Sequence, residues 1–372
     1  MFMKSLLPGL SALAFFIIVG LCIAISGCIG GHYFPKMDIL VSKYNSDGQD
    51  TWSTTIDSGK DDYATAIIET SDGGYAIAGW ISEKHGYPNN ARIIRLDTVG
   101  RIVWDRTLES SEVYSVALAE ASDGGFVVAQ NINNFDSGKI SRIDADGRLV
   151  WNRTFDSAFK TIILTRDGRF ALAGTRTFVI DGNGTLTLDL PDISTSILQA
   201  SDGGFFVERS GVPESYGTLS RLDANGTWIW TRTVGSHEMG KITSLHETQE
   251  GTVEVIYTYT DRTKDKDLVM FMESEQITFG KNGTIISSMP LVAVDPVSRT
   301  SNEGYVFAAY PFPGSTAFTS FPHADSNLHL VRLTSQGALV WQRSLDLPQW
   351  VAPQSIIQTR DGGFVTLVVT GL

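Results

Sequence analysis

A short phrase of an acidic residue, one or two glycines and an apolar run recurs along this chain and limits the folds open to it. The strongest copies read Asp-Gly-Gly followed by an aromatic residue, and the weaker copies keep only the acid and one glycine. A glycine-containing turn between short apolar runs is typical of a β-hairpin. Seven such turns indicate an all-β repeat protein. The acids of the seven copies are Asp72, Asp123, Asp167, Asp202, Glu250, Glu303 and Asp361.

A second phrase alternates with the first and carries a turn glycine followed, in most copies, by a tryptophan. Its clearest copy covers residues 95–107. The turn glycines, which follow one another at 52, 47, 37, 42, 57 and 54 residues, are Gly48, Gly100, Gly147, Gly184, Gly226, Gly283 and Gly337. Roughly 40 to 50 residues is the length of one four-stranded propeller blade. The two phrases together therefore mark four strands in each repeat.

These repeats predict an all-β fold, a seven-bladed β-propeller of four-stranded antiparallel blades over residues 38–372. A four-stranded blade has two faces to cover, and packing the blades in a ring covers both. The repeats begin with the second phrase and end within the first. We therefore expect the last blade to take its inner strands from residues 354–370 and its outer strands from residues 38–56. Pairing of the N- and C-terminal strands would close the ring.

A tryptophan follows the turn glycine in five of the seven repeats. We interpret these residues as blade-packing residues, because a side chain that recurs in every blade serves what the blades share, and a buried aromatic ring brings a large apolar area. Four of them are followed two positions later by an arginine on the same strand face, where stacking on the ring is expected. The tryptophans are Trp52, Trp104, Trp151, Trp230 and Trp341, and the arginines are Arg106, Arg153, Arg232 and Arg343.

The N-terminal residues read as a targeting segment. Lys4 precedes an apolar stretch over residues 10–25, which is typical of a secretory signal. The stretch ends in Ile-Ser-Gly-Cys at residues 25–28, which resembles the lipobox of bacterial and archaeal lipoproteins. The resemblance implies that residues 1–27 are a signal peptide, that Cys28 carries a lipid on its sulfur, and that residues 28–37 are a tether. The alternative is an uncleaved signal-anchor helix, because about 20 apolar residues span a bilayer.

Either anchor attaches the propeller to the cell membrane on its extracytoplasmic side. Both cysteines, Cys22 and Cys28, lie in the first thirty residues, so we expect no disulfide framework in the propeller. The chain has 29 Lys and Arg against 41 Asp and Glu, and this acidic balance argues against nucleic acid as a partner. We expect a monomer whose only membrane contact is its anchor.

The two phrases resemble those of pyrroloquinoline-quinone-like propeller proteins, in which each blade carries an Asp, a turn Gly and a Trp that packs between blades. They resemble more closely the bacterial and archaeal extracytoplasmic repeat proteins with a Ser-Asp-Gly-Gly-aromatic phrase. The resemblance covers about residues 38–372 and implies the fold, not a function. One departure is that Asp97 and Gly100 are three residues apart, one fewer than in the quinone-enzyme turn. The phrase also resembles the Asp-box of sialidase propellers, but Arg generally replaces its Ser or Thr.

Both phrases are tight turns, so strand order places them on one face of the disc and the variable connections on the other. The variable connections include residues 82–90, 209–217, 261–267, 311–327 and 346–353. Variable loops on a rigid scaffold commonly carry binding. The candidate binding residues on these loops are Tyr87, Phe312, Phe318, Phe321, His323 and Trp350. The alternative is that these aromatic residues pack within their own loops.

The sequence contains weak metal and modification patterns. His323, Asp325 and His329 are too loosely spaced for a zinc site, which needs three or four convergent ligands. Residues 45–50 and 144–147 resemble fragments of a calcium loop but lack its acid at the twelfth position, so turn-forming residues explain them better. We expect no cofactor and no metal. Four positions fit the N-glycosylation pattern, namely Asn152, Asn183, Asn225 and Asn282. Three of them coincide with a turn glycine, where Asn-Gly is favoured anyway.

The resulting functional hypothesis is a surface-anchored, non-enzymatic binding or scaffold module that meets a protein or glycan partner through its variable loops. The alternative is an extracytoplasmic propeller enzyme: a quinone-dependent dehydrogenase, a glycan hydrolase or a lyase. The sequence contains no Ser-His-Asp arrangement, phosphate loop or dinucleotide fingerprint. This argues only weakly against an enzyme, because catalytic groups of a propeller lie far apart in sequence.

Overall fold

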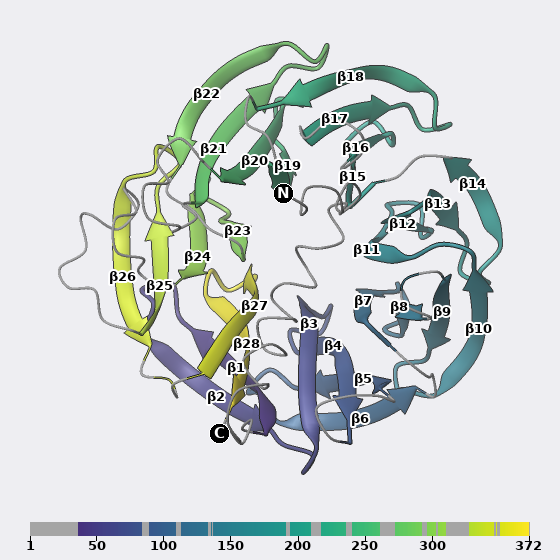
Figure 1. Cartoon of the computed structure of the whole chain (residues 1–372), viewed down its shortest axis with the longest axis vertical. Helices are drawn as coiled ribbons and strands as arrows, with labels where there is room; N and C mark the ends of the chain where they lie inside the picture. Colours follow the sequence, from purple (N-terminus) through teal and green to yellow (C-terminus); the bar gives the residue numbers. More distant parts are fainter. Residues whose placement is uncertain are drawn as a thin grey trace, which may run out of the picture.

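A computed structural model describes residues 36–371 except 84–88, 109–112, 133–134, 136, 191–193, 210–216, 236–239, 261–271, 292–295, 303, 310–326, 346 and 348–349. The described residues form 28 strands and no helix. The strands build seven four-stranded antiparallel sheets arranged in a ring (Figure 1). The predicted seven-bladed propeller is therefore confirmed. No described segment is a helix of the length and hydropathy needed to cross a bilayer, and the predicted N-terminal signal or anchor lies outside the described residues.

We number the blades in chain order and give each strand from the innermost outwards. Blade 1 is β3 (Asp61–Glu69), β4 (Tyr75–Ser82), β5 (Asn89–Leu96) and β6 (Ile102–Leu108), and blade 2 is β7 (Ser115–Glu120), β8 (Phe126–Ile132), β9 (Ser137–Ile143) and β10 (Leu149–Phe155). Blade 3 is β11 (Phe159–Leu164), β12 (Phe170–Gly174), β13 (Thr177–Ile180) and β14 (Leu186–Leu190), and blade 4 is β15 (Ser196–Gln199), β16 (Phe205–Arg209), β17 (Gly217–Leu222) and β18 (Trp228–Val234). Blade 5 is β19 (Lys241–Glu247), β20 (Val253–Thr260), β21 (Met272–Phe279) and β22 (Ile285–Leu291), and blade 6 is β23 (Val297–Arg299), β24 (Tyr305–Ala309), β25 (Leu328–Leu333) and β26 (Leu339–Leu345).

Blade 7 is assembled from both ends of the chain. Its order is β27 (Trp350–Gln358), β28 (Phe364–Gly371), β1 (Met37–Tyr44) and β2 (Asp50–Ile56), from the inside outwards. β1 pairs with β28 along its whole length, from Met37 opposite Gly371 to Tyr44 opposite Phe364. In Figure 1 the purple N-terminal strands accordingly lie beside the yellow C-terminal ones. The phase of the repeats predicted this seam between the termini, which closes the ring by strand pairing.

The hydrophobic core lies between neighbouring blades. One cluster joins blades 1 and 2 through residues such as Ile93, Val116 and Phe126, and another joins blade 7 to blade 1 through Val365 and Ile77. Each of these side chains is at most 2% exposed. Fully burying such a side chain contributes about 1.5–3 kcal/mol. Packing between neighbouring blades therefore stabilises the ring.

The tryptophans of the second phrase dock on the turn glycine of the next blade. The indole of Trp104 in blade 1 donates its Nε1 proton to the carbonyl of Ala145 in blade 2, at 2.8 Å. A Cβ placed on Gly147 would meet this ring at 3.0 Å. Trp151, Trp230 and Trp341 donate in the same way to Gly182, Lys281 and Ser46, and Trp52 packs on Gly100. The arginines two positions later donate to the same turns, at Asp146, Asn183, Gly283 and Gly48.

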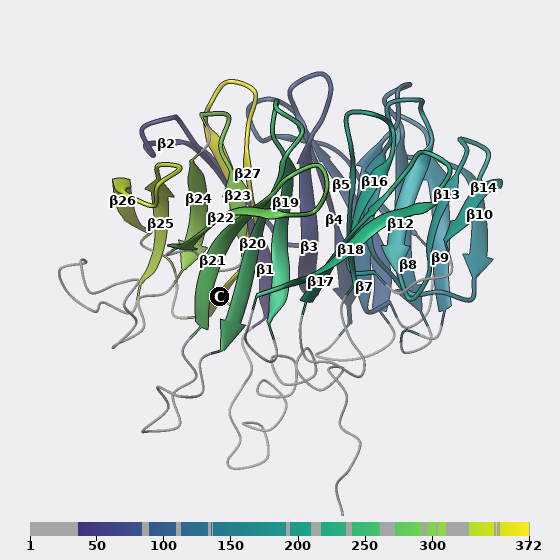
Figure 2. The same ribbon diagram turned by 90° about the horizontal axis from the view of Figure 1, so that it is seen from above.

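The hairpin turns of both phrases lie on one face of the disc, at the top in Figure 2. We call this the turn face. The described strand ends that lead into the second-to-third-strand connections and into the connections between blades lie at the opposite face, which we call the loop face. Each strand runs from one face of the disc to the other. A residue near the end of a strand therefore lies near the face at which that strand begins or ends.

Candidate functional site

Most of the predicted binding residues fall outside the described residues. These are Tyr87, Phe312, Phe318, Phe321 and His323, as well as the predicted lipidation residue Cys28. Trp350 is the first residue of β27, paired with Gly371 at the loop-face end of blade 7. His329 is 5% exposed, and its ring nitrogen Nδ1 lies 2.7 Å from the amide Nε2 of Gln342 in the neighbouring strand.

The four glycosylation candidates are all exposed. Asn183, Asn225 and Asn282 occupy hairpin turns on the turn face, and Asn152 lies on the outer strand β10. Asn282 uses its side-chain oxygen within its own turn, because Oδ1 accepts from the backbone N–H of Thr284 at 3.1 Å. Glycosylation of these positions remains a prediction.

A group of polar side chains lies at the loop-face ends of the first and second strands of neighbouring blades, and we call it the inner-strand cluster. It consists of Lys160 in β11, Thr195 before β15, Glu208 in β16 and Lys241 in β19. These residues come from blades 3, 4 and 5. Register places them together at the loop face, because Glu208 pairs with Ser196 at the first position of β15, and Lys241 begins β19.

Glu208 is the buried centre of this cluster. Its side chain accepts a hydrogen bond from the Thr195 hydroxyl and a longer one, 3.4 Å, from the backbone N–H of Ile242 in blade 5. Burial raises the pKa of Glu208, and these hydrogen bonds together with the charges of Lys160 and Lys241 act against that rise. Glu208 is 2% exposed and lies on the face that carries the variable connections.

The surrounding protein disfavours the charged form of Lys160, as it does that of Glu208. Its side chain reaches solvent, yet the surrounding protein lowers the pKa of its ammonium by desolvation, with Lys241 adding to the effect and Glu208 opposing it. A similar position in blade 2 is neutral: Asn131 accepts from the Phe159 backbone N–H in blade 3 at 2.5 Å and donates to its carbonyl at 2.5 Å. Glu208 thus combines a link between blades with a titratable group, and the cluster can present two cations beside a carboxyl group.

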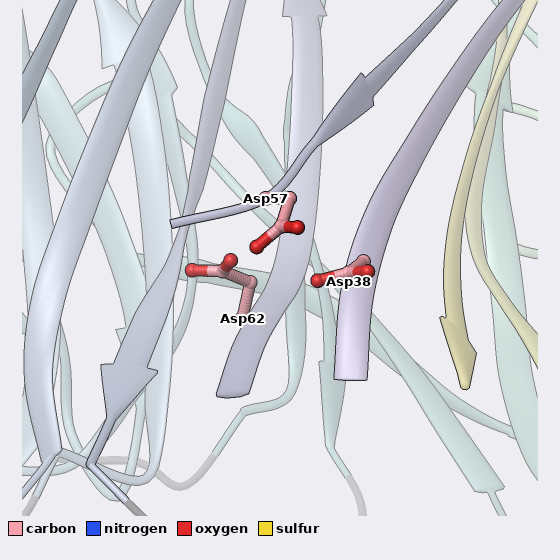
Figure 3. A group of neighbouring side chains, drawn as sticks. All are labelled: Asp38, Asp57 and Asp62. Carbon is pink, nitrogen blue, oxygen red and sulfur yellow. The ribbon is translucent and has the colours of Figure 1, made fainter. Parts of the chain in front are cut away.

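A second group consists of three carboxylates at the seam, and we call it the seam acid cluster. Asp38 lies in β1, Asp57 directly follows β2, and Asp62 lies in β3 of blade 1 (Figure 3). One carboxylate oxygen from each lies within 4.8 Å of those from the other two. The cluster is on the loop face, because β1 and β3 begin there and β2 ends there.

Two cations neighbour the seam acid cluster. The Lys36 ammonium lies 2.5 Å from Asp57 Oδ1 and 3.2 Å from Asp38 Oδ1. Arg92 in β5 pairs with Asp62 and also with Asp105. Burial raises the pKa of Asp38 and that of Asp62. The hydrogen bond from Lys36 lowers the pKa of Asp57, which is the exposed member of the group.

Sequence reasoning missed both clusters. The seam acid cluster carries one local signal, the run Asp-Ser-Gly-Lys-Asp-Asp at residues 57–62. Its backbone already folds around carboxylates: Gly59 N–H donates to Asp57 Oδ1 at 2.6 Å, and Ser58 N–H donates to Asp62 Oδ2 at 2.8 Å. Asp38 joins this run through the β1–β2 hairpin, because the register that sets Ile39 opposite Ile56 brings Asp38 beside Asp57.

No protein-family model matches the sequence, and a search of curated proteins finds no match either. The chain is similar in structure to hydrazine synthase of Kuenenia stuttgartiensis, with a TM-score of 0.56 and 13% identity over 82% of this chain and 94% of that chain. It is also similar to a catalytically inactive virginiamycin B lyase of Staphylococcus aureus with quinupristin, with a TM-score of 0.53 and 13% identity over 89% and 100%. A streptogramin B lyase gives a TM-score of 0.51 and 14% identity over 90% and 98%. At such identities these likenesses show the fold alone.

Proposed function

We propose that this protein is a membrane-anchored, extracytoplasmic binding or scaffold module that meets a protein or glycan partner through its loop face. The proposal rests on the anchor expected from residues 1–28 and on the unequal construction of the two faces. Propeller folds host many unrelated roles, so the argument has to come from the faces of this chain.

The main support for this proposal is that the turns on the turn face share one geometry, whereas the connections on the loop face differ in length. All fourteen hairpin turns, seven of each phrase, share one backbone hydrogen bond from the N–H of the first residue to the carbonyl four residues on. The connections between second and third strands in blades 1 to 6 instead range from two residues (175–176) to 18 (310–327). Variation confined to one face of a rigid scaffold is the pattern of loops that carry binding.

The inner-strand cluster adds chemistry on the same face. Lys160 and Lys241 offer two ammonium groups, whose charges also act on the buried carboxyl group of Glu208. Two ammonium groups suit an acidic or hydroxyl-rich partner, because lysines act as point charges toward anions and donate hydrogen bonds to hydroxyl oxygens. These residues come from inner strands rather than loops, so their positions do not depend on the connections.

The enzyme alternative is favoured by one observation, the raised pKa of Glu208 beside two lysines. Titratable groups with perturbed pKa values are candidates for acid–base roles. Two of the structural neighbours named above are lyases, but they share only the fold with this chain. A lyase activity would require Glu208 to reach a substrate, and its 2% exposure opposes this.

The test compares loop-face and turn-face variants of equal charge change. The full chain, purified in mild detergent, is used to capture partners from the envelope fraction of its own cells and to probe a glycan panel. Lys160→Ser with Lys241→Ser is expected to weaken recovery about tenfold or more. Arg101→Ser with Arg148→Ser, which removes two exposed arginines from the turn face, should leave recovery unchanged. Equal recovery by both double variants would contradict the assigned face.

A further inference from the structure

Asp38 is a buried carboxylate without a hydrogen-bond donor. It is 0% exposed, and neither of its oxygens accepts a hydrogen bond among the described residues. Lys36 approaches Oδ1 at 3.2 Å as an ion pair, and nothing described approaches Oδ2 within hydrogen-bond reach. Burying a charge destabilises a protein unless the charge is paired and hydrogen-bonded. The side chain points toward Asp57 and Asp62 in Figure 3.

A second orphaned oxygen lies on the adjacent strand. Thr370 of β28 is the register partner of Asp38, so the two side chains share one face of the blade 7 sheet. The Thr370 hydroxyl is buried and also makes no hydrogen bond among the described residues. Buried polar groups are nearly always satisfied in native proteins, and a bound water or ion is one explanation of an exception.

The charged side chains around the seam acid cluster have a net charge of about −2, which a divalent cation would neutralise. Asp38, Asp57, Asp62 and Asp105 carry four negative charges within this network, and Lys36 and Arg92 carry two positive ones. Four minus two leaves two negative charges. Lys36 lies at the start of the described chain with a side chain 35% exposed, so it can swing into solvent when a stronger cation arrives.

We propose that Asp38, Asp57 and Asp62 bind one Ca²⁺ ion at the seam between blade 7 and blade 1, with Thr370 beside them. The three ligand oxygens lie within 4.8 Å of one another. Ca²⁺ accepts six to eight oxygen ligands in flexible geometry, whereas Mg²⁺ demands a near-ideal octahedron and keeps several waters, so an irregular set of carboxylates favours Ca²⁺. An all-oxygen set also disfavours zinc and copper, which prefer nitrogen and sulfur.

The ion would join the outer hairpin of blade 7, formed by β1 and β2, to the innermost strand of blade 1. Asp38 belongs to the N-terminal strand, Asp57 to the connection from blade 7, and Asp62 to the innermost strand of blade 1. Arg92 extends the network to β5 and Asp105 to β6. Extracellular calcium modules bind with dissociation constants of about 10⁻⁴–10⁻³ M, which is the range expected of a site with three carboxylates.

The first experiment is calcium binding by calorimetry on the full chain in mild detergent, after treatment with EDTA. The original protein should bind one Ca²⁺ in the range above and prefer it to Mg²⁺. Asp38→Asn keeps the shape of the side chain and should weaken binding about tenfold or more, because it removes one anionic ligand. Asp146→Asn removes an exposed turn-face carboxylate and should leave binding unchanged. Absence of binding, or equal binding by Asp38→Asn, would overturn the proposal.

Thermal melts distinguish a cation site from a merely structural acid. At about ten times the dissociation constant, Ca²⁺ should raise the melting temperature of the original protein by about 2 °C and leave Asp38→Asn unmoved. In EDTA, Asp38→Asn should be at least as stable as the original, because it removes a buried charge whose ion-pair partner, Lys36, is partly exposed and can be solvated instead. If Asp38→Asn is less stable in EDTA and calcium does not raise the melting temperature of the original protein, Asp38 forms an ion pair with Lys36 and binds no cation.

Another variant tests the calcium site if Asp38→Asn fails to fold. Lys36→Met removes the competing ammonium from Asp38 and Asp57 and leaves all three carboxylates in place. It should tighten calcium binding about threefold or more, because the ion no longer displaces a cation. Unchanged or weaker binding would count against the site. The outcome is independent of the partner proposed above, since partner capture in EDTA tests the binding role separately.

Discussion

At the scale of single residues, a buried arginine inside three of the blades is the main feature that sequence reasoning overlooked. Arg95 in β5 donates to Asp72 in the first-phrase turn, and the same pairing joins Arg142 to Asp123 and Arg221 to Asp202. Both members lay inside recognised phrases, but each phrase was interpreted only as a turn. The missing step was that the second and third strands are adjacent, which brings the Asp of one phrase to the Arg of the other. In blade 7 Lys43 pairs with Asp361 instead.

Glu208 provides a prediction in which the sign of the pH dependence follows from burial. Burial raises its pKa, so the folded protein holds a proton that the unfolded chain, with an ordinary pKa of about 4.3, has released. The free energy of unfolding should therefore fall as the pH rises above about 4.3 toward the raised pKa. Glu208→Gln cannot ionise and should show a flatter profile over that interval in urea unfolding at several pH values.

The control for this prediction is Glu250→Gln, which changes an exposed glutamate in a turn-face hairpin. It should keep the slope of the original protein. If Glu208→Gln keeps that slope as well, burial does not govern the protonation of Glu208, and its proposed place in the binding cluster loses its electrostatic basis.

At the scale of elements, the strands were predictable because each turn glycine marks a hairpin whose flanking runs are apolar. The two decayed repeats illustrate the limit of this reasoning. β13 and β14 surround a turn without a tryptophan in the fourth strand, yet Leu188 and Leu190 occupy the corresponding place against Gly226 of the next blade. A leucine in an apolar strand carries no distinguishing signal, so this docking could be recognised only from the fold.

The docking of one blade on the next gives a prediction for a matched pair of glycines. Gly147 and Gly168 both have left-handed backbone, with φ of 79° and 80°. A Cβ on Gly147 would meet Arg106 at 2.8 Å and Trp104 at 3.0 Å, whereas a Cβ on Gly168 meets nothing within 4 Å. Gly168→Ala should destabilise by about 1–2 kcal/mol from backbone strain alone. Gly147→Ala should lose a further 1–3 kcal/mol or so from the steric overlap.

Urea unfolding of both glycine variants, followed by tryptophan fluorescence, measures the difference. Backbone strain is common to the two positions. The difference between the two losses in free energy of unfolding therefore isolates the contribution of the contact between blades. Equal losses would mean that the indole moves aside freely and that the docked tryptophan contributes little to blade packing.

At the scale of the whole molecule, the phase of the repeats predicted a ring closed by its two termini, but the side chains gathered at the seam were out of reach. The seam acid cluster combines residue 38 with residues 57 and 62, and these become neighbours through the register of the β1–β2 hairpin and the packing of β3 against β1. The predicted aromatic binding residues are mostly in connections outside the described residues. The binding role of these aromatic residues therefore stays a prediction. The polar groups of the inner-strand cluster are among the described residues of the loop face.

Ring closure itself is tested by deleting residues 354–372, which removes β28 and most of β27. Five side chains of the lost strand are at most 3% exposed, and they are Phe364, Val365, Leu367, Val368 and Val369. At about 1.5–3 kcal/mol each their loss is comparable to the whole net stability of a domain, about 5–15 kcal/mol. The deletion also leaves β1 as an unpaired edge strand, which favours aggregation. We therefore expect the truncated chain to lose its cooperative melt, as followed by circular dichroism.

The comparison for this deletion is a chain in which residues 310–326 are replaced by a short Gly-Ser linker. It removes a similar length of sequence but no strand of any blade. Because the entropy of closing a loop depends only weakly on its length, this chain should melt close to the original. A truncated chain that melts like the loop-shortened one would mean that blades 1 to 6 are stable as an open arc. The seam, and a cation bound there, would then have no part in holding the ring together.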